Sequence, residues 1–327
     1  MSAPWSTATD VGLADVAPWV PHPLHAPDRA WPESNCYLDL WIALLHAKGL
    51  EPLAMLGPAA AVDFEGDQWR FCKPSMRAIR ELYGIELCEL QLYRDLESHV
   101  AAQARRDVAV LVEVDAHWLP DTTGTTYRAG HQKTTIATWR IDRVHERLRY
   151  LHNGGMHTLE GEDYRGLFTT AREGLPPYAE FVRFDLVRAL PHDVLAATAM
   201  RLLVDEMRHR TNADAMMRFR ASLEDELEWV ARHDLEHFHQ WAFATVRQLG
   251  SAAGLTEAHL AWLGAAGYGV GRAAPIFGEL SAAAKVLQFR LARVPAGGRV
   301  PDVTLLLRAV TQAWHSAMRT LDDVADG

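Results

Sequence analysis

The chain has 327 residues, of which 49% are hydrophobic and 23% charged, so a sizeable core is available to an ordinary globular protein. The formal net charge of −9 argues against a general role in nucleic-acid binding. Three cysteines are too few for a disulfide framework, and no apolar run reaches the roughly 18 residues of a membrane span. The first residues also lack the pattern of a secretory signal, so we expect a cytoplasmic protein without membrane association.

The N-terminal part predicts an extended segment followed by a helix. Residues 1–30 are rich in Pro, Ala and Asp and show no sustained period, which is typical of an extended lead-in. A broad apolar stripe then predicts a helix over about 36–48, with Asn35 as a start signal and Gly49 as a stop. Cys36 therefore lies at the mouth of an apolar helix.

A succession of strands and short helices is predicted next. The segment 108–114 gives the strongest strand signal, because it is β-branched and almost continuously apolar, as in a strand buried on both faces. Turn residues at 142–146 join the two following strands into an antiparallel meander, and residues 153–155 end the second of these strands abruptly. Strands are also expected at 68–72, 85–93, 131–139, 148–152 and 180–184, and short helices at 74–83 and 96–105. This succession predicts an α+β domain.

The chain changes character at about residue 191. Ala, Leu, Arg and Glu dominate from there on, and the apolar residues recur at helical spacing. Helices are expected at 194–210, 216–250, 256–264, 274–294 and 302–324. We therefore predict an all-α helical domain at 191–327, preceded by the α+β domain at 31–190 and the lead-in at 1–30.

Three residues in the α+β domain predict nucleophilic chemistry. A thiol in the first turn of a helix, such as that of Cys36, feels the positive end of the helix dipole, which favours the thiolate. A thiolate nucleophile needs a base and a group that orients the base. His131 begins one predicted strand and Asn153 ends the next, so a hairpin between them would make the two residues neighbours. The order predicts Cys36 as nucleophile, His131 as base and Asn153 as orienting residue, as in papain-like enzymes.

Several alternatives stay open for this site. His152 and His157 are rivals for the base, and Asp142 is a rival for the orienting residue. Strand alternation places His152 on the face opposite Asn153, and a one-residue register shift would exchange them. Cys36 could also be a buried apolar residue without chemistry. Side chains that border the predicted cleft and could contact substrate are Asn35, Glu113, Asp115, His117 and His152.

Two other patterns are assigned structural roles. His233 and His237 have the spacing of metal ligands on one helix face, but no further ligand completes a site nearby. Residues 63–69 carry three carboxylates around a glycine, and their spacing does not match a calcium loop, so we expect a turn with solvated charges. The sequence predicts neither a metal nor a cofactor.

Longer motifs carry a family resemblance, and they lie at 31–41, 63–69, 111–115, 119–122, 159–163, 243–250 and 284–292. In these motifs the chain resembles a bacterial family known as domain of unknown function 1839.

More distantly, the first domain resembles the papain-like acyltransferases of the butirosin type. Those enzymes move an acyl group from a carrier-protein thioester to an amine, so the resemblance implies a papain-like fold and the roles given above to Cys36, His131 and Asn153. Papain-like peptidases carry a glutamine about six residues before the cysteine, where this chain has Ala30, which favours an activated thioester over a peptide as substrate.

These observations predict a cysteine-dependent acyl- or aminoacyltransferase that uses a carrier-protein or coenzyme A thioester as donor. One alternative is a thioesterase or amide hydrolase with the same site, and another is a non-catalytic binding or scaffold protein. The expected partners are an acyl carrier protein and a small amine acceptor, with a homodimer as a further candidate. Arginines on the helical domain would suit an acidic carrier: Arg201, Arg208, Arg210, Arg218 and Arg220.

Overall fold

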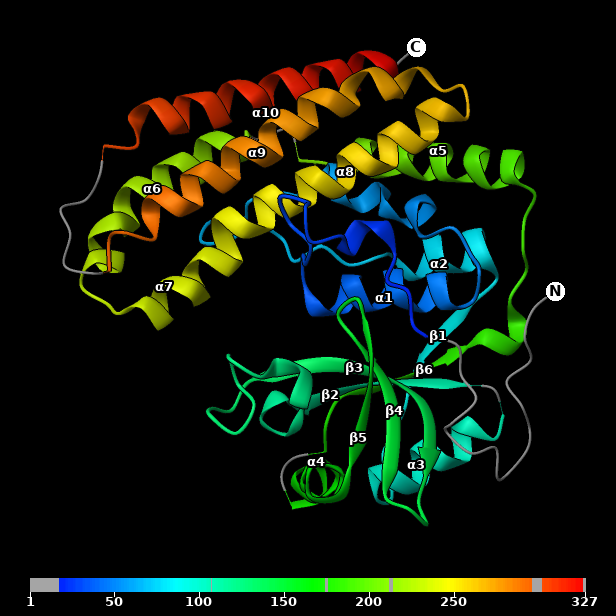
Figure 1. Ribbon diagram of the computed structural model, residues 1–327. Coiled ribbons are helices and arrows are strands. Elements are labelled where there is room, and N and C mark those ends of the chain that lie inside the picture. Colours follow the sequence, from blue (N-terminus) through cyan, green and yellow to red (C-terminus); the bar gives the residue numbers. More distant parts are fainter. Residues whose placement is uncertain (1–17, 107, 174–175, 212–213, 296–301, 326–327) are drawn as a thin grey trace. The chain divides into compact units, whose positions relative to one another are not determined.

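The chain divides into two compact units. The sheet unit comprises residues up to 25, 35–52 and 79–190, and the helical unit comprises 26–34, 53–78 and the chain from 191 onward. The computed structural model describes residues 18–106, 108–173, 176–211, 214–295 and 302–325 (Figure 1). Segments 26–34 and 53–78, which the sequence groups with the lead-in and the α+β domain, thus pack with the C-terminal helices.

An antiparallel sheet forms the centre of the sheet unit, in the strand order β1-β6-β2-β3-β4-β5. The mixed α+β class predicted from the sequence is therefore confirmed. The strands are β1 (Glu86–Glu89), β2 (Ala109–Asp115), β3 (Lys133–Asp142), β4 (Arg147–His152), β5 (Gly155–Glu160) and β6 (Ala179–Arg183).

The strand expected at 148–152 ends at His152, as predicted, but the chain then turns back and pairs β5, a strand that was not predicted, with β4, so that His152 lies opposite Gly155. Asn153 takes a φ of 48°, which Asn tolerates well, so a tight hairpin can form at this point. The strand expected at 68–72 is not formed, and residues 63–69 contribute one isolated bridge between Phe64 and Trp69.

Helices cover both faces of this sheet (Figure 1). The face that carries Val112, Ile136 and Tyr150 packs against α3 (Leu96–Ala104) and α4 (Gly161–Glu173), and we call it the α4 face. The opposite face packs against α1 (Cys36–Ala47), and we call it the α1 face. Its assignment follows from the Tyr37 hydroxyl, which donates a hydrogen bond of 2.8 Å to Glu180 on β6.

The helix α1 forms where the sequence predicts it. Asn35 is extended and its Oδ1 accepts a hydrogen bond of 2.9 Å from the Leu38 N–H, the usual arrangement of an N-cap. Gly49 takes a φ of 68° just past the last turn, which ends the helix. Residues 37–45 are all buried. Cys36 thus begins a helix that is fixed in place by its own core residues.

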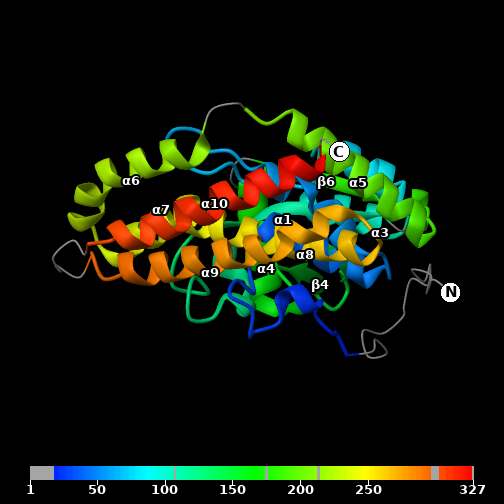
Figure 2. The same cartoon turned by 90° about the horizontal axis from the view of Figure 1, so that it is seen from above.

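In the helical unit, the long helices α8 and α9 pack against each other, and α10 packs on α9 (Figure 2). The expected single helix over 216–250 is interrupted, because Asp234 caps a new helix by accepting a hydrogen bond of 3.0 Å from the His237 N–H. The helices of this unit are α5 (His192–Arg208), α6 (Ala215–Ala231), α7 (Leu235–Ala242), a π-helical turn (Phe243–Arg247), α8 (Gln248–Ala265), α9 (Ala274–Leu291) and α10 (Thr304–Ala325). The helix α2 (Met76–Tyr83) begins in this unit, and its residues 79–83 belong to the sheet unit. Among the described residues, none of the helices combines the length and apolarity that a membrane crossing requires.

The segment 63–69 forms the predicted turn, with residues 65–68 exposed, whereas Asp63, Phe64 and Trp69 on either side of the turn are buried in the helical unit. Asp63 is buried, accepts a hydrogen bond of 2.7 Å from the Thr211 hydroxyl and forms an ion pair of 2.5 Å with Arg218. Trp69 is also buried, and its ring centroid lies 5.6 Å from that of Phe219. A buried carboxylate with a cationic partner ties this segment to α6.

Candidate functional site

Polar side chains gather on the α1 face where β2 ends and β3 begins. Cross-strand pairs share a face, so Glu113 and Asp115 lie on the same side of the sheet as Lys133, which pairs with Asp115. Lys133 Nζ lies 2.7 Å from a Glu113 carboxylate oxygen. His131, two residues before Lys133, places its Nδ1 at 2.6 Å from the Asp115 Oδ2. The end of the central strands therefore carries an Asp–His pair and a Lys–Glu pair side by side.

The Asp115 carboxylate orients the His131 ring. Its other oxygen, Oδ1, accepts hydrogen bonds from the backbone N–H groups of His117 at 3.0 Å and Gln132 at 3.3 Å. Burial acts to raise the pKa of Asp115, but the hydrogen bond from His131 and those backbone donors outweigh it and hold the pKa below its usual value. The carboxylate is therefore charged at neutral pH and fixes the imidazole through Nδ1, which leaves Nε2 as the nitrogen for proton transfer.

His131 is open to solvent although its ring is fixed. Its side chain is 75% exposed, and the ring stacks on that of His117 with the centroids 4.5 Å apart and the planes at 8°. The His117 ring is held in turn by a hydrogen bond of 3.1 Å between its Nδ1 and the Gly130 carbonyl oxygen. An oriented and accessible imidazole has the properties of a general base.

Cys36 is the first residue of α1, the helix that packs on the α1 face. The residue is half-buried, and it directly follows the N-cap Asn35. The first N–H groups of a helix lack intrahelical acceptors, so this position offers both the helix dipole and backbone donors. Backbone donors at this position suit an oxyanion that forms next to the Cys36 sulfur.

The structure does not pair Asn153 with His131 in the way the predicted hairpin implied. Ala137 pairs with Leu151, and one further step of two residues along each strand brings Asn153 level with Thr135. His131 is four residues further along, a separation of about 13 Å along a strand. Asn153 instead begins the hairpin turn to β5, and the carboxylate at His131 is that of Asp115.

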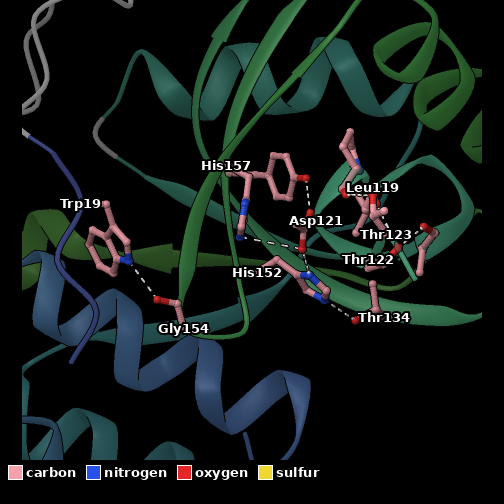
Figure 3. Close-up of polar contacts among 12 residues, drawn as sticks. Trp19, Leu119, Asp121, Thr122, Thr123, Thr134, His152, Gly154 and His157 are labelled. Carbon is pink, nitrogen blue, oxygen red and sulfur yellow. Dashed lines mark hydrogen bonds and ion pairs between the residues drawn. The ribbon is translucent and has the colours of Figure 1, made fainter. Parts of the chain in front are cut away.

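His152 lies on the other side of the sheet (Figure 3). It follows Leu151 and so alternates onto the α4 face, where its side chain is 4% exposed. Its Nδ1 lies 2.5 Å from the Asp121 Oδ2, and its Nε2 lies 2.8 Å from the Thr134 hydroxyl. Since α1 packs on the opposite face, His152 faces away from the helix that begins at Cys36.

Asp121 is the centre of this second polar group (Figure 3). The Tyr150 hydroxyl also donates a hydrogen bond to its carboxylate, and His157 Nε2 lies 3.8 Å away. Burial acts to raise the pKa of Asp121, but the hydrogen bond and charge of His152 and the contacts of His157 and Tyr150 outweigh it and lower the pKa. Sequence reasoning did not single out Asp121, although the period of two along β4 places Tyr150 and His152 on one face.

His233 and His237 lie at the junction between α6 and α7. His233 Nδ1 lies 2.7 Å from the Trp229 carbonyl oxygen and the two rings stack at 4.0 Å, while His237 Nδ1 lies 2.7 Å from the Asp234 carboxylate. Within the part of the chain that the structure describes, no group of three or more His, Cys, Asp or Glu side chains is arranged to hold a metal ion.

The arginines expected to meet an acidic carrier are largely engaged inside the helical unit. Arg218 pairs with Asp63 as described above, and Arg210 lies 2.7 Å from Asp322. Arg201 and Arg220 face acidic residues one turn further along their own helices. These side chains therefore offer less free positive charge than their number implies.

The chain thus has an α+β sheet unit, which carries an oriented Asp–His pair, and a helical unit. The chain belongs to the DUF1839 family: the model of the DUF1839 N-terminal domain matches residues 20–184, and that of the DUF1839 C-terminal domain matches residues 192–323. No curated protein matches the chain.

Proposed function

We propose that the chain is a cysteine-dependent acyl- or aminoacyltransferase that takes its acyl group from a carrier-protein or coenzyme A thioester. The observation that carries the proposal is the Asp115–His131 pair, an accessible imidazole oriented by a carboxylate on the face that α1 covers. Cys36 at the start of α1 is the proposed nucleophile. Asp115 takes the orienting role in this proposal, and Asn153 stays a predicted residue of the site.

The proposed reaction has two steps that share one acyl-enzyme. The Cys36 thiolate attacks the thioester carbonyl, the carbon–sulfur bond to the donor breaks, and the donor thiol leaves with a proton from the His131 imidazolium. An amine then attacks the Cys36 thioester, His131 takes the amine proton, and the Cys36 thiolate is released. Backbone N–H groups at the start of α1 would stabilise each oxyanion, at about 3 kcal/mol for a donor of this kind.

Intact-mass analysis tests the proposal most directly. The chain is incubated with a panel of acyl-coenzyme A thioesters and acyl-pantetheine carrier proteins, and the mass of the covalent adduct is read. We expect an acyl adduct on Cys36 that is absent from Cys36→Ala and formed much more slowly by His131→Ala. Cys88→Ala is the matched control, since Cys88 is half-buried too but lies in β1, and it should acylate like the wild type.

Two results separate this proposal from its alternatives. Release of free acid in the absence of an amine, at the rate seen with an amine, would assign a thioesterase or amide hydrolase with the same residues. An absence of adduct across the panel, together with a Cys36 that iodoacetamide alkylates no faster than Cys88, would refute a catalytic cysteine and leave a binding or scaffold protein.

A further inference from the structure

The helical unit contains a pocket that the proposed acyl transfer does not use. Its volume is about 400 Å³, within the range of about 300–1,000 Å³ that small-molecule sites occupy. Segment 29–31 forms one side, and α8 and α9 form the others. The apolar part of the lining consists of Ala30, Trp31, Leu255, Pro275 and Ala282.

Glycines let the two helices and the Trp31 ring come close together around this pocket. A Cβ atom on Gly250 would lie 2.4 Å from the Trp31 ring, and one on Gly254 would lie 3.0 Å from the Ser281 hydroxyl. The Trp31 indole N–H donates to the Ser281 carbonyl oxygen at 3.3 Å. Trp31 and Ser281 are buried, so this side of the pocket is a fixed wall.

Arg29 and Glu257 bring opposite charges to the same cavity. One guanidinium nitrogen of Arg29 donates to the Gly254 carbonyl oxygen at 3.2 Å, which fixes the group and leaves most of its N–H donors for a ligand. Among the described residues, Arg29 and Glu257 form no ion pair with each other or with any other side chain. Two opposite charges are thus held in one cavity without direct contact.

The Glu257 carboxylate lies against α9 at Gly278. A Cβ atom on Gly278 would lie 2.5 Å from its Oε1, so a larger residue there would displace the carboxylate. Burial raises the pKa of Glu257, and the charge of Arg29 opposes that shift. A half-buried carboxylate without a direct cationic partner is costly, and a bound ammonium group would offset that cost.

We propose that this pocket binds a small zwitterion of the α-amino-acid class, with its carboxylate on Arg29 and its ammonium group on Glu257. The planar guanidinium matches a carboxylate in a two-point hydrogen bond. The side chain of the ligand lies along Trp31 and Leu255, which favours an apolar amino acid. The inference goes beyond the proposed acyl transfer and does not depend on it.

Calorimetric titration of the full-length chain tests the proposal. The probes are L-leucine and two analogues that each lack one charge, 4-methylpentanoate and 3-methylbutylamine. We expect L-leucine to bind and both analogues to bind at least about tenfold more weakly, the loss typical of one unmatched charged group. Equal binding of 4-methylpentanoate would show a simple anion site, and no heat with L-leucine or any other standard amino acid at millimolar concentration would also overturn the proposal.

Variants of the pocket give an independent test. Arg29→Met and Glu257→Gln should each weaken L-leucine binding at least about tenfold, with folding checked by circular dichroism. Gly278→Ala should do the same by displacing the Glu257 carboxylate. Glu279→Gln is the matched control, because Glu279 is exposed on α9, and it should bind like the wild type. Wild-type affinity in Arg29→Met or Glu257→Gln would refute the assignment.

Discussion

Replacing Asp121 with Asn should destabilise the sheet unit more than the same substitution in an exposed Asp–His pair would. The Asp121 carboxylate is 11% exposed and accepts hydrogen bonds from the Tyr150 hydroxyl and from His152 Nδ1 at 2.5 Å. Hydrogen bonds to a charged group contribute about 1.5–3 kcal/mol each. Asn keeps one acceptor oxygen, but its NH2 group must face the other donor, so one bond is lost and one buried donor is left unsatisfied. We expect the free energy of unfolding to fall by about 2–4 kcal/mol.

Urea unfolding with a matched control checks this value. Asp142→Asn is the control, because Asp142 pairs with His145 at a similar distance, 2.7 Å, but the Asp142 side chain is 37% exposed and that of His145 is 70% exposed. That pair should contribute about 1 kcal/mol or less. With a slope of roughly 1–3 kcal/mol/M, the midpoint of Asp121→Asn should fall by about 1–2 M and that of Asp142→Asn by much less. Hydrogen exchange in peptides from β3 and β4 assigns the loss to the sheet unit. Equal midpoints for the two variants would refute the reasoning.

Three further outcomes follow from the same contacts. The pKa of Asp121 is lower in the folded state than in the unfolded state, where it is about 3.9. The stabilisation that the Asp121 carboxylate provides is therefore present above about pH 4 and is lost as the pH falls through the folded-state pKa. The difference in free energy of unfolding between wild type and Asp121→Asn, measured with urea, should accordingly shrink below about pH 4. In the helical unit, Asp63→Asn removes the ion pair to Arg218 and should lower the free energy of unfolding by about 2 kcal/mol, since Arg218 is 38% exposed. His152→Ala should lower the midpoint of thermal unfolding and leave the rate at which iodoacetamide alkylates the cysteine at the start of α1 unchanged. His131→Ala should slow this alkylation and leave the midpoint of thermal unfolding unchanged.

Local signals explain why α1 and β2 could be predicted from the sequence. Asn35 and Gly49 bracket an apolar stripe, and the segment 108–114 is apolar over its whole length, as a strand buried on both faces requires. The strand β5 could not be predicted, because only Leu159 is buried in it and no alternation marks the others. The buried role of Asp63 was missed for a similar reason, since its partner Arg218 lies 155 residues away.

In the candidate site, too, the features that depend on neighbouring residues could be predicted, and those that depend on long-range contacts could not. Strand alternation was enough to place His152 on the face opposite Leu151, because it depends only on neighbouring residues. The contact of His131 with Asp115 depends on the register between β2 and β3, in which Asp115 pairs with Lys133, and on the path of the loop between them. A register is set by packing across the whole sheet, so no short motif reports it.

One sheet carries the same pair of side chains on its two faces, and burial decides what each pair can do. On the α4 face, His152 is 4% exposed and both ring nitrogens are engaged, so a proton cannot be exchanged without breaking the Asp121 group. On the α1 face, His131 is 75% exposed and only Nδ1 is engaged, so Nε2 can take and return a proton while Asp115 holds the ring. An imidazole that must transfer protons needs one free nitrogen and a fixed orientation, and of His131 and His152 only His131 has both. The Asp115–His131 pair is therefore the strongest structural reason to look for chemistry on the α1 face, whereas the Asp121–His152 pair contributes stability on the other.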